Sequence, residues 1–175
     1  ILWVNLVMDT LAALAFGGEP ALRRFMREKP KRRDESIISE TMWSSILVGA
    51  GYTVLISLIF LIAGKNWMYE WRYFPKIHGT AYFALFIFIA VFNAFNARTE
   101  EINLFDNITR NRNFLKIMTL IAVVQVLLTY FGGDIFQCYG LNIVHWCLIL
   151  IIAVAIIPVD IIRKCIIRLI NPNKK

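Results

Sequence analysis

The sequence predicts an all-α protein: a polytopic membrane helix bundle with five transmembrane helices, the first of them truncated. Apolar residues make up 58% of the 175 residues and the mean hydropathy is +0.61, whereas soluble domains contain roughly 45–50% apolar residues. These residues occur in long blocks with few charges. The blocks do not alternate with a period of two, and an open sheet would leave backbone groups unpaired in lipid, so strands are excluded.

The apolar blocks set the expected spans, because a helix needs roughly 20 residues to cross about 30 Å of hydrocarbon. In chain order the spans are about 1–16, 41–63, 77–97, 114–131 and 143–162. The first block opens without an initiating Met, a basic leader or a cleavage site, so we interpret it as part of a helix cut from a longer protein. Ser39 before Glu40 predicts the start of the second helix, and Pro158 predicts a kink in the last one.

The basic residues between the blocks predict the orientation. Lys and Arg number seven in residues 17–40, four in 98–116 and five in 163–175, against three in 64–76 and none in 132–142. The positive-inside rule therefore places the connections 17–40 and 98–113 and the C-terminal 163–175 in the cytoplasm.

Two patterns have ordinary structural interpretations. In the second span Ser45, Gly49 and Thr53 recur every four residues, and such a stripe of small residues lets another helix approach closely. Cys138 and Cys147 are expected near one membrane face, where they could form a disulfide or remain free thiols that act as small apolar residues.

Only two of the twelve acidic residues, Asp9 and Asp160, fall within the expected spans. Asp160 is close to Arg163 and Lys164 near the end of its span, which favours ion pairing. Asp9 is near the middle of the membrane, where an ionised carboxylate costs roughly 2.5–3.5 kcal/mol on insertion scales. Asn5 is one helical turn earlier and projects from the same face.

Asn5 and Asp9 together offer an amide oxygen and a carboxylate. Such ligands suit a hard cation such as calcium, which takes six to eight oxygens. The remaining ligands would have to come from other helices or from backbone carbonyls. The alternative is an Asn–Asp pair that hydrogen-bonds to a neighbouring helix, as occurs in membrane bundles generally.

The other polar residues of the spans are neutral. Asn93 and Asn96 are three residues apart near a cytoplasmic end, which favours hydrogen bonding between helices or capping, and Gln125 is in the fourth span. The sequence contains no hydrolytic triad, metal-hydrolase helix or phosphate-binding glycine loop, so we expect no catalytic residue in this chain.

Residues Leu2 to Asp9, with Glu19 and Pro20 after them, resemble the sixth transmembrane helix of the P-type calcium ATPases. Further similar stretches match the eighth helix, the loop after it and the end of the ninth helix: Phe92–Arg98, Asn103–Asp106, Arg110–Phe114 and Tyr130–Gly133. The plasma-membrane type matches best, and the five spans would be helices six to ten of its ten.

The resemblance implies that Asn5 and Asp9 bind the transported Ca²⁺. Pumps of the reticulum type, which have two calcium sites, carry a threonine ligand just before the aspartate and a glutamate ligand in the eighth helix. Met8 and Ala90 occupy those positions here. Because a thioether and a methyl group supply no hard oxygen ligand, the resemblance implies a single calcium site.

The resemblance also implies what surrounds this region. The chain would be the C-terminal membrane half of an ATP-driven calcium pump of the plasma membrane, with ATP and Mg²⁺ used only by the full-length protein and the fragment inactive alone. Its expected partners are the lipid bilayer, the upstream transmembrane helices and, through residues 17–40, the cytoplasmic phosphorylation domain of the same protein, with no nucleic acid. The alternatives are a P-type pump for another cation and a non-enzymatic helical channel or anchor.

Overall fold

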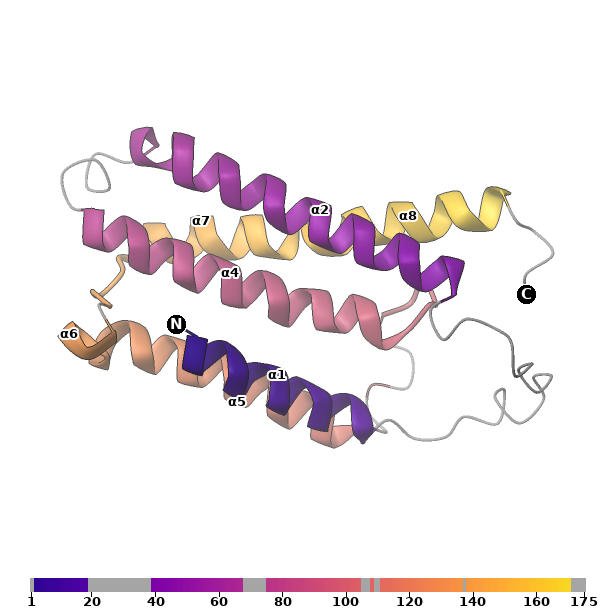
Figure 1. Ribbon diagram of the computed structural model, residues 1–175, viewed down its shortest axis with the longest axis horizontal. Helices are drawn as coiled ribbons and strands as arrows, with labels where there is room; N and C mark the ends of the chain where they lie inside the picture. Colours follow the sequence, from indigo (N-terminus) through magenta and orange to yellow (C-terminus); the bar gives the residue numbers. More distant parts are fainter. Residues whose placement is uncertain are drawn as a thin grey trace.

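The computed structural model describes residues 2–18, 39–67, 75–104, 108, 111–136 and 138–170, and this part of the chain is helical without strands (Figure 1). The helices are α1 (Leu2–Gly17), α2 (Glu40–Ala63), the short η2 (Gly64–Asn66), α4 (Pro75–Arg98), α5 (Arg112–Phe131), α6 (Gly133–Phe136), α7 (Ile143–Val154) and α8 (Ile156–Ile170). The predicted fold class, an all-α bundle of membrane-spanning helices, is confirmed.

Four of the expected spans are long and apolar enough to cross a membrane: α2, α4, α5 and the consecutive helices α7 and α8. The first, α1, has 16 residues and is shorter than a full span. Most of the basic connection 17–40 lies outside the described residues, so its predicted contact with a phosphorylation domain stays a prediction.

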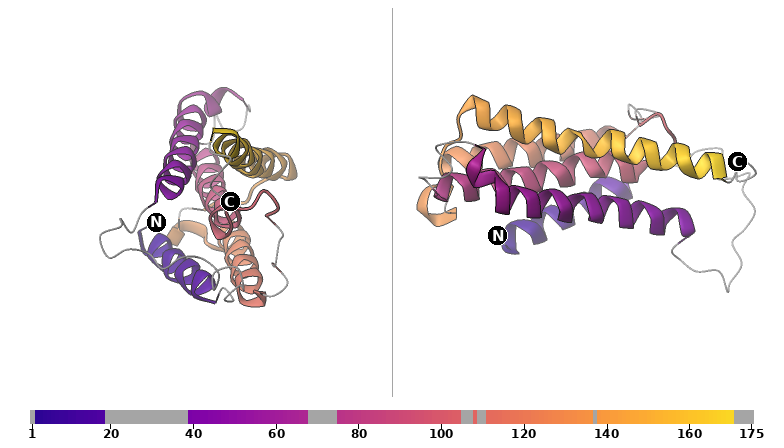
Figure 2. Two further views of the ribbon diagram at one scale, coloured as in Figure 1. Left: turned by 90° about the vertical axis from the view of Figure 1, so that its right-hand side faces the viewer. Right: turned by 90° about the horizontal axis from the view of Figure 1, so that it is seen from above.

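Helix α4 is the central element. It packs against α2, α7 and α8 on one side and against α5 on the other, while α1 packs on α5 (Figure 2). Two clusters of buried side chains follow from this arrangement. One joins Phe60 of α2 and Leu85 of α4 to Ile149 of α7, and the other joins Ile87 of α4 to Phe114 of α5. The side chains of α4 therefore belong to both clusters.

The start of α2 follows from its sequence. The Ser39 hydroxyl accepts a hydrogen bond from the Met42 backbone N–H at 3.2 Å, which satisfies one of the donors left free in the first turn of the helix. The predicted N-cap is confirmed. Further along α2, a Cβ atom at Gly49 would lie 3.2 Å from Nδ2 of Asn93 in α4. The predicted close approach of a second helix is therefore observed at Gly49.

The last span is interrupted where the sequence predicts a kink. Helix α7 ends at Val154 and α8 begins at Ile156. Pro158 lacks the N–H that a continuous helix would donate to the carbonyl of Val154, which explains the break at this point. Helix α8 then continues to Ile170, past residue 162 where the expected span ends.

Candidate cation site

Helix α1 packs through one face. Met8, Leu11 and Ala15, which are spaced three and four residues apart, contact the cluster that contains Phe114 and Met118 of α5. Ala15 is fully buried. This face is the one expected for a helix that lies along a single neighbour, since residues three and four apart share one side of a helix.

Asp9 points away from the packed face. It follows Met8 in the chain, so its side chain is rotated by about 100° around the helix axis, and the residue is exposed. No ion pair or hydrogen bond from the described part of the chain neutralises it. Asn5 belongs to the same helix one turn earlier, but its side chain lies outside the described residues. A shared cation at Asn5 and Asp9 stays a prediction.

Asp160 is in the opposite situation, because its neutralising groups are in its own helix. The residue is 4% exposed. Its carboxylate forms ion pairs with Nε of Arg163 at 2.6 Å and with Nζ of Lys164 at 2.9 Å. These residues are three and four positions later in α8, which is the spacing of side chains that face each other on a helix. The predicted ion pairing is confirmed.

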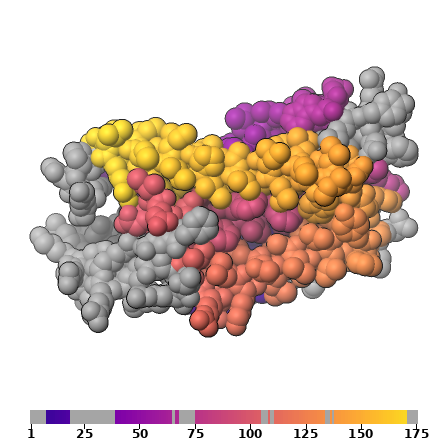
Figure 3. All heavy atoms as spheres, turned by 180° about the vertical axis from the view of Figure 1, so that it is seen from behind, coloured from indigo at the N-terminus to yellow at the C-terminus, as the bar shows by residue number. Residues whose placement is uncertain are grey.

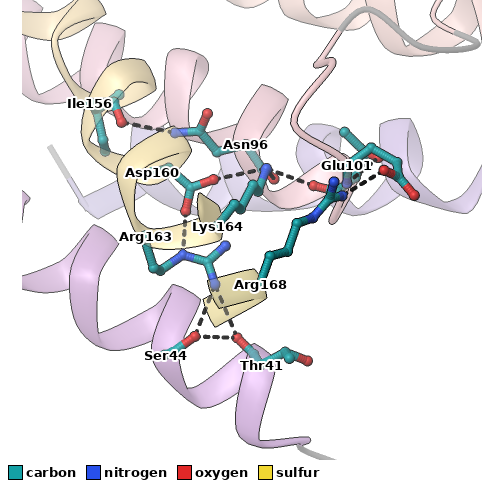
Figure 4. A network of polar contacts seen from close by, with 10 residues as sticks. Thr41, Ser44, Asn96, Glu101, Ile156, Asp160, Arg163, Lys164 and Arg168 are labelled. Carbon is teal, nitrogen blue, oxygen red and sulfur yellow. Dashed lines mark hydrogen bonds and ion pairs between the residues drawn. The ribbon is translucent and has the colours of Figure 1, made fainter. Parts of the chain in front are cut away.

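The two basic residues also join α8 to other helices (Figure 4). Lys164 donates hydrogen bonds to the backbone carbonyls of Asn96, at 3.2 Å, and Thr99, at 2.8 Å, where α4 ends. Arg163 donates to the Ser44 hydroxyl of α2 at 2.9 Å. Sequence reasoning missed these contacts. The only sequence signal was the pair of cations placed three and four residues after an aspartate.

The neutral polar residues of the spans have different partners. Asn96 donates from Nδ2 to the Ile156 carbonyl of α8 at 3.2 Å, which confirms hydrogen bonding between helices. Its Oδ1 atom is buried and has no hydrogen-bond partner among the described residues. Gln125 is paired within α5, where its Nε2 donates to the Thr129 hydroxyl at 3.5 Å.

Comparison with known proteins decides the family. The profile of the family described as "Cation transporting ATPase, C-terminus" matches residues 1–166 of this chain. The chain belongs to this family. Its first helix, with Asn5 and Asp9, falls inside the matched region.

Individual relatives of this cation-ATPase region are named as calcium pumps. "Calcium-transporting ATPase 2" of Schizosaccharomyces pombe is 30% identical over 168 residues, which cover 95% of this chain and 13% of that protein. "Probable calcium-transporting ATPase 6, plasma membrane-type" of Oryza sativa is 34% identical, with 95% and 16% covered. "Plasma membrane calcium-transporting ATPase 1" of Homo sapiens is 36% identical, with 83% and 13% covered. The resemblance to plasma-membrane-type calcium ATPases is confirmed, and the chain spans 13–16% of the length of these relatives.

The described part of the ATPase region offers no preassembled metal cluster. No group of three or more His, Cys, Asp or Glu side chains there is arranged to hold a metal ion. Cys138 is a buried free thiol and Cys147 an exposed one. A cation at Asp9 would need further oxygen ligands from beyond these residues, because calcium takes at least six.

Proposed function

We propose that this chain is the C-terminal membrane part of an ATP-driven calcium pump and that α1 contributes Asn5 and Asp9 to its intramembrane calcium site. The relatives are named as calcium-transporting ATPases, and the family match covers nearly the whole chain. Calcium is the transported substrate in this proposal. ATP and Mg²⁺ would act in the full-length protein, in parts that lie outside this chain.

The difference between the two aspartates of the spans carries the proposal. Asp160 is buried and has two cationic partners in its own helix, whereas Asp9 has none in the described part of the chain. An ionised carboxylate in a membrane helix is costly unless a partner neutralises it. A divalent cation supplies the charge that would neutralise Asp9.

We further propose one calcium ion per cycle. Met8 packs with the apolar cluster beside α5 and supplies no oxygen. Ala90 of α4 is exposed and supplies none either. These two positions carry oxygen ligands in the two-site pumps of the reticulum type, so a second site in this chain would lack both of them.

The orientation belongs to the same proposal. The C-terminus of α8, the end of α4 and the start of α5 lie at one end of the bundle (Figure 1). The basic residues of 17–40, 98–113 and 163–175 favour the cytoplasm for this end, under the positive-inside rule. The connection 17–40 would then reach the cytoplasmic phosphorylation domain of the same protein. The membrane that holds the pump would be the plasma membrane.

The test is Asp9→Asn in the intact protein encoded by the gene. We expect this variant to lose calcium-dependent phosphorylation by ATP, because it removes the charge that holds the ion. Leu14→Ala is the matched control, since Leu14 is 65% exposed in the same helix and carries no ligand atom. Normal calcium-dependent phosphorylation of Asp9→Asn would refute the site.

Two measurements separate the alternatives. Bound calcium per phosphorylated protein should be one, and a value of two would refute the single site. Phosphorylation driven by another divalent cation in the absence of calcium would identify a pump for that cation. Absence of any ATP-dependent phosphorylation of the intact protein would favour a channel or anchor.

A further inference from the structure

Helix α5 carries a glutamine on its buried side. The buried residues of this helix are three or four positions apart: Phe114, Met118, Ile121, Gln125 and Thr129. The first three belong to the apolar cluster that joins α5 to α1 and α4. Gln125 continues the same side of the helix one turn further and is 2% exposed. A polar side chain inside a membrane bundle is costly, so its presence calls for an explanation.

The hydrogen bonds of Gln125 do not supply that explanation. Its Nε2 donates to the Thr129 hydroxyl at 3.5 Å, which is longer than the roughly 2.7–3.2 Å usual for such bonds. The Thr129 hydroxyl donates back to the Gln125 backbone carbonyl at 2.9 Å. Oε1 of Gln125 accepts no hydrogen bond from the described residues. The acceptor of a buried amide is therefore left unused by the packing of these helices.

Helices α1 and α5 lie against each other in opposite directions (Figure 1). In the view from behind, α5 forms part of the surface and little of α1 is visible (Figure 3). Two contacts fix their alignment near the end of α1. Asn111 Nδ2 donates to the Ala15 carbonyl at 3.4 Å, and the ring centroids of Phe16 and Phe114 are 5.8 Å apart.

This alignment places Gln125 at the depth of Asn5. Gln125 is eleven residues after Phe114 in α5, and Asn5 is eleven residues before Phe16 in α1. At 1.5 Å per residue, both positions are roughly 16 Å from the contact between the two rings and in the same direction. The unused acceptor therefore lies level with one of the two residues assigned to the cation site.

Asn5 is also nearer to α5 than Asp9 is. The side of α1 that packs on α5 is marked by Met8, Leu11 and Ala15. At 100° per residue, the position of Asn5 is about 90° from the centre of that side, and the position of Asp9 is about 130° from it. Asn5 is thus at the edge of the interface with α5, and Asp9 is beyond the edge.

We infer that Gln125 is a positioning residue of the calcium site, and that its Oε1 accepts a hydrogen bond from Nδ2 of Asn5. The Asn5 amide has one oxygen and one NH₂ group, and only the oxygen binds a hard cation. An acceptor for the NH₂ group fixes the rotation of the amide and directs its oxygen toward the ion held by Asp9. Partners behind metal ligands commonly orient them in this way. The inference rests on the calcium site proposed above for α1.

The experiment is Gln125→Met in the intact protein, with the calcium dependence of phosphorylation by ATP as the readout. The calcium concentration at half-maximal phosphorylation should rise by about three- to tenfold, which corresponds to the loss of one hydrogen bond. The maximal phosphorylation at saturating calcium should not change. Ile121→Met is the matched control, because it introduces the same side chain one turn earlier on the same buried side, where Ile121 is 5% exposed. It should leave the calcium dependence unchanged.

Two further measurements separate positioning from a structural role. Unfolding without calcium should be no easier for Gln125→Met than for the unchanged protein, because an apolar side chain replaces a buried amide with incomplete hydrogen bonds. Asn5→Asp keeps an oxygen ligand and removes the NH₂ donor. In that background Gln125→Met should shift the calcium dependence by less than about twofold, since residues that act through one another are not additive.

Several outcomes would overturn the inference. An unchanged calcium dependence in Gln125→Met, with Asp9→Asn inactive, would leave the cation site intact and remove Gln125 from it. Equal shifts in Gln125→Met and Ile121→Met would indicate a general disturbance of α5. Equal shifts with and without Asn5→Asp would show that Gln125 does not act through Asn5. Calcium-dependent phosphorylation of Asp9→Asn would refute the calcium site itself, and this inference with it.

Discussion

The ammonium group of Lys164 lies 2.8 Å from the backbone carbonyl of Thr99 and donates a hydrogen bond to it. The same group donates a second hydrogen bond to the Asn96 carbonyl at 3.2 Å and forms an ion pair with the Asp160 carboxylate at 2.9 Å. Lys164 thereby connects α8 to the end of α4 while it neutralises Asp160. The Lys164 side chain is only 3% exposed.

Lys164→Met should destabilise the protein by about 3–5 kcal/mol, because it leaves a buried carboxylate with one cation instead of two and frees two carbonyls. Unfolding of the intact protein in mixed micelles measures this. Arg168→Met is the control: Arg168 pairs with Glu101 in the open, with side chains 49% and 44% exposed, and its loss should cost no more than about 1 kcal/mol. Equal losses in the two variants would contradict the role given to Lys164.

The contact between α2 and α4 predicts a difference between two glycines of α2. Gly49→Val should push against the Asn93 amide, whereas Gly51 has nothing within 4 Å of the position of its Cβ. Valine has the same helix propensity at both positions, so the difference reports packing alone. We expect Gly49→Val to be less stable than Gly51→Val by about 1–3 kcal/mol. Identical unfolding midpoints would mean that α2 and α4 are not in close contact at Gly49.

The hydrogen bond from Trp146 Nε1 of α7 to the Tyr130 hydroxyl of α5 is tested by Tyr130→Phe. The variant removes the acceptor of Trp146 Nε1 and leaves the Leu141 carbonyl without this donor, which should cost about 1–3 kcal/mol. Tyr82→Phe is a control in α4. If Tyr130→Phe unfolds no more easily than Tyr82→Phe, the pair does not hold α5 and α7 together.

The reactivity of Cys138 should be low. Burial raises the pKa of the Cys138 thiol above its ordinary value. A raised pKa means a smaller fraction of thiolate near pH 8, and the thiolate is the reactive form. Alkylation by iodoacetamide, followed by peptide mass spectrometry, should therefore be slower at Cys138 than at the partly exposed Cys165 and should accelerate as the pH rises. Fast labelling near neutral pH would contradict the burial.

Hydropathy, capping residues and proline positions predicted the helices well, because each depends only on residues that are close together in the sequence. The lengths of α2, α4 and α5 follow from the cost of placing polar groups in lipid, and the Ser39 cap and the break before Pro158 follow from backbone hydrogen bonding within a few residues. The Asp160 ion pairs were predicted for the same reason, since all three residues lie within one turn of α8.

The contacts between distant segments could not be predicted in this way. Arg163 and Ser44 are 119 positions apart, and Lys164 and Asn96 are 68 apart. No periodicity in the sequence indicates that a residue of α8 will reach the end of α4. The exposed position of Asp9 is also a result of packing, because it depends on which face of α1 meets α5.

The sequence by itself determined the class of the protein and the positions of its long apolar helices. These properties follow from the solvation of each side chain and from bonding between near neighbours. Only the tertiary structure decided that α4 is central and that Asp160 is neutralised while Asp9 is left exposed. Those properties depend on how helices far apart in the chain pack, which is fixed by the complementary shapes of whole helix surfaces.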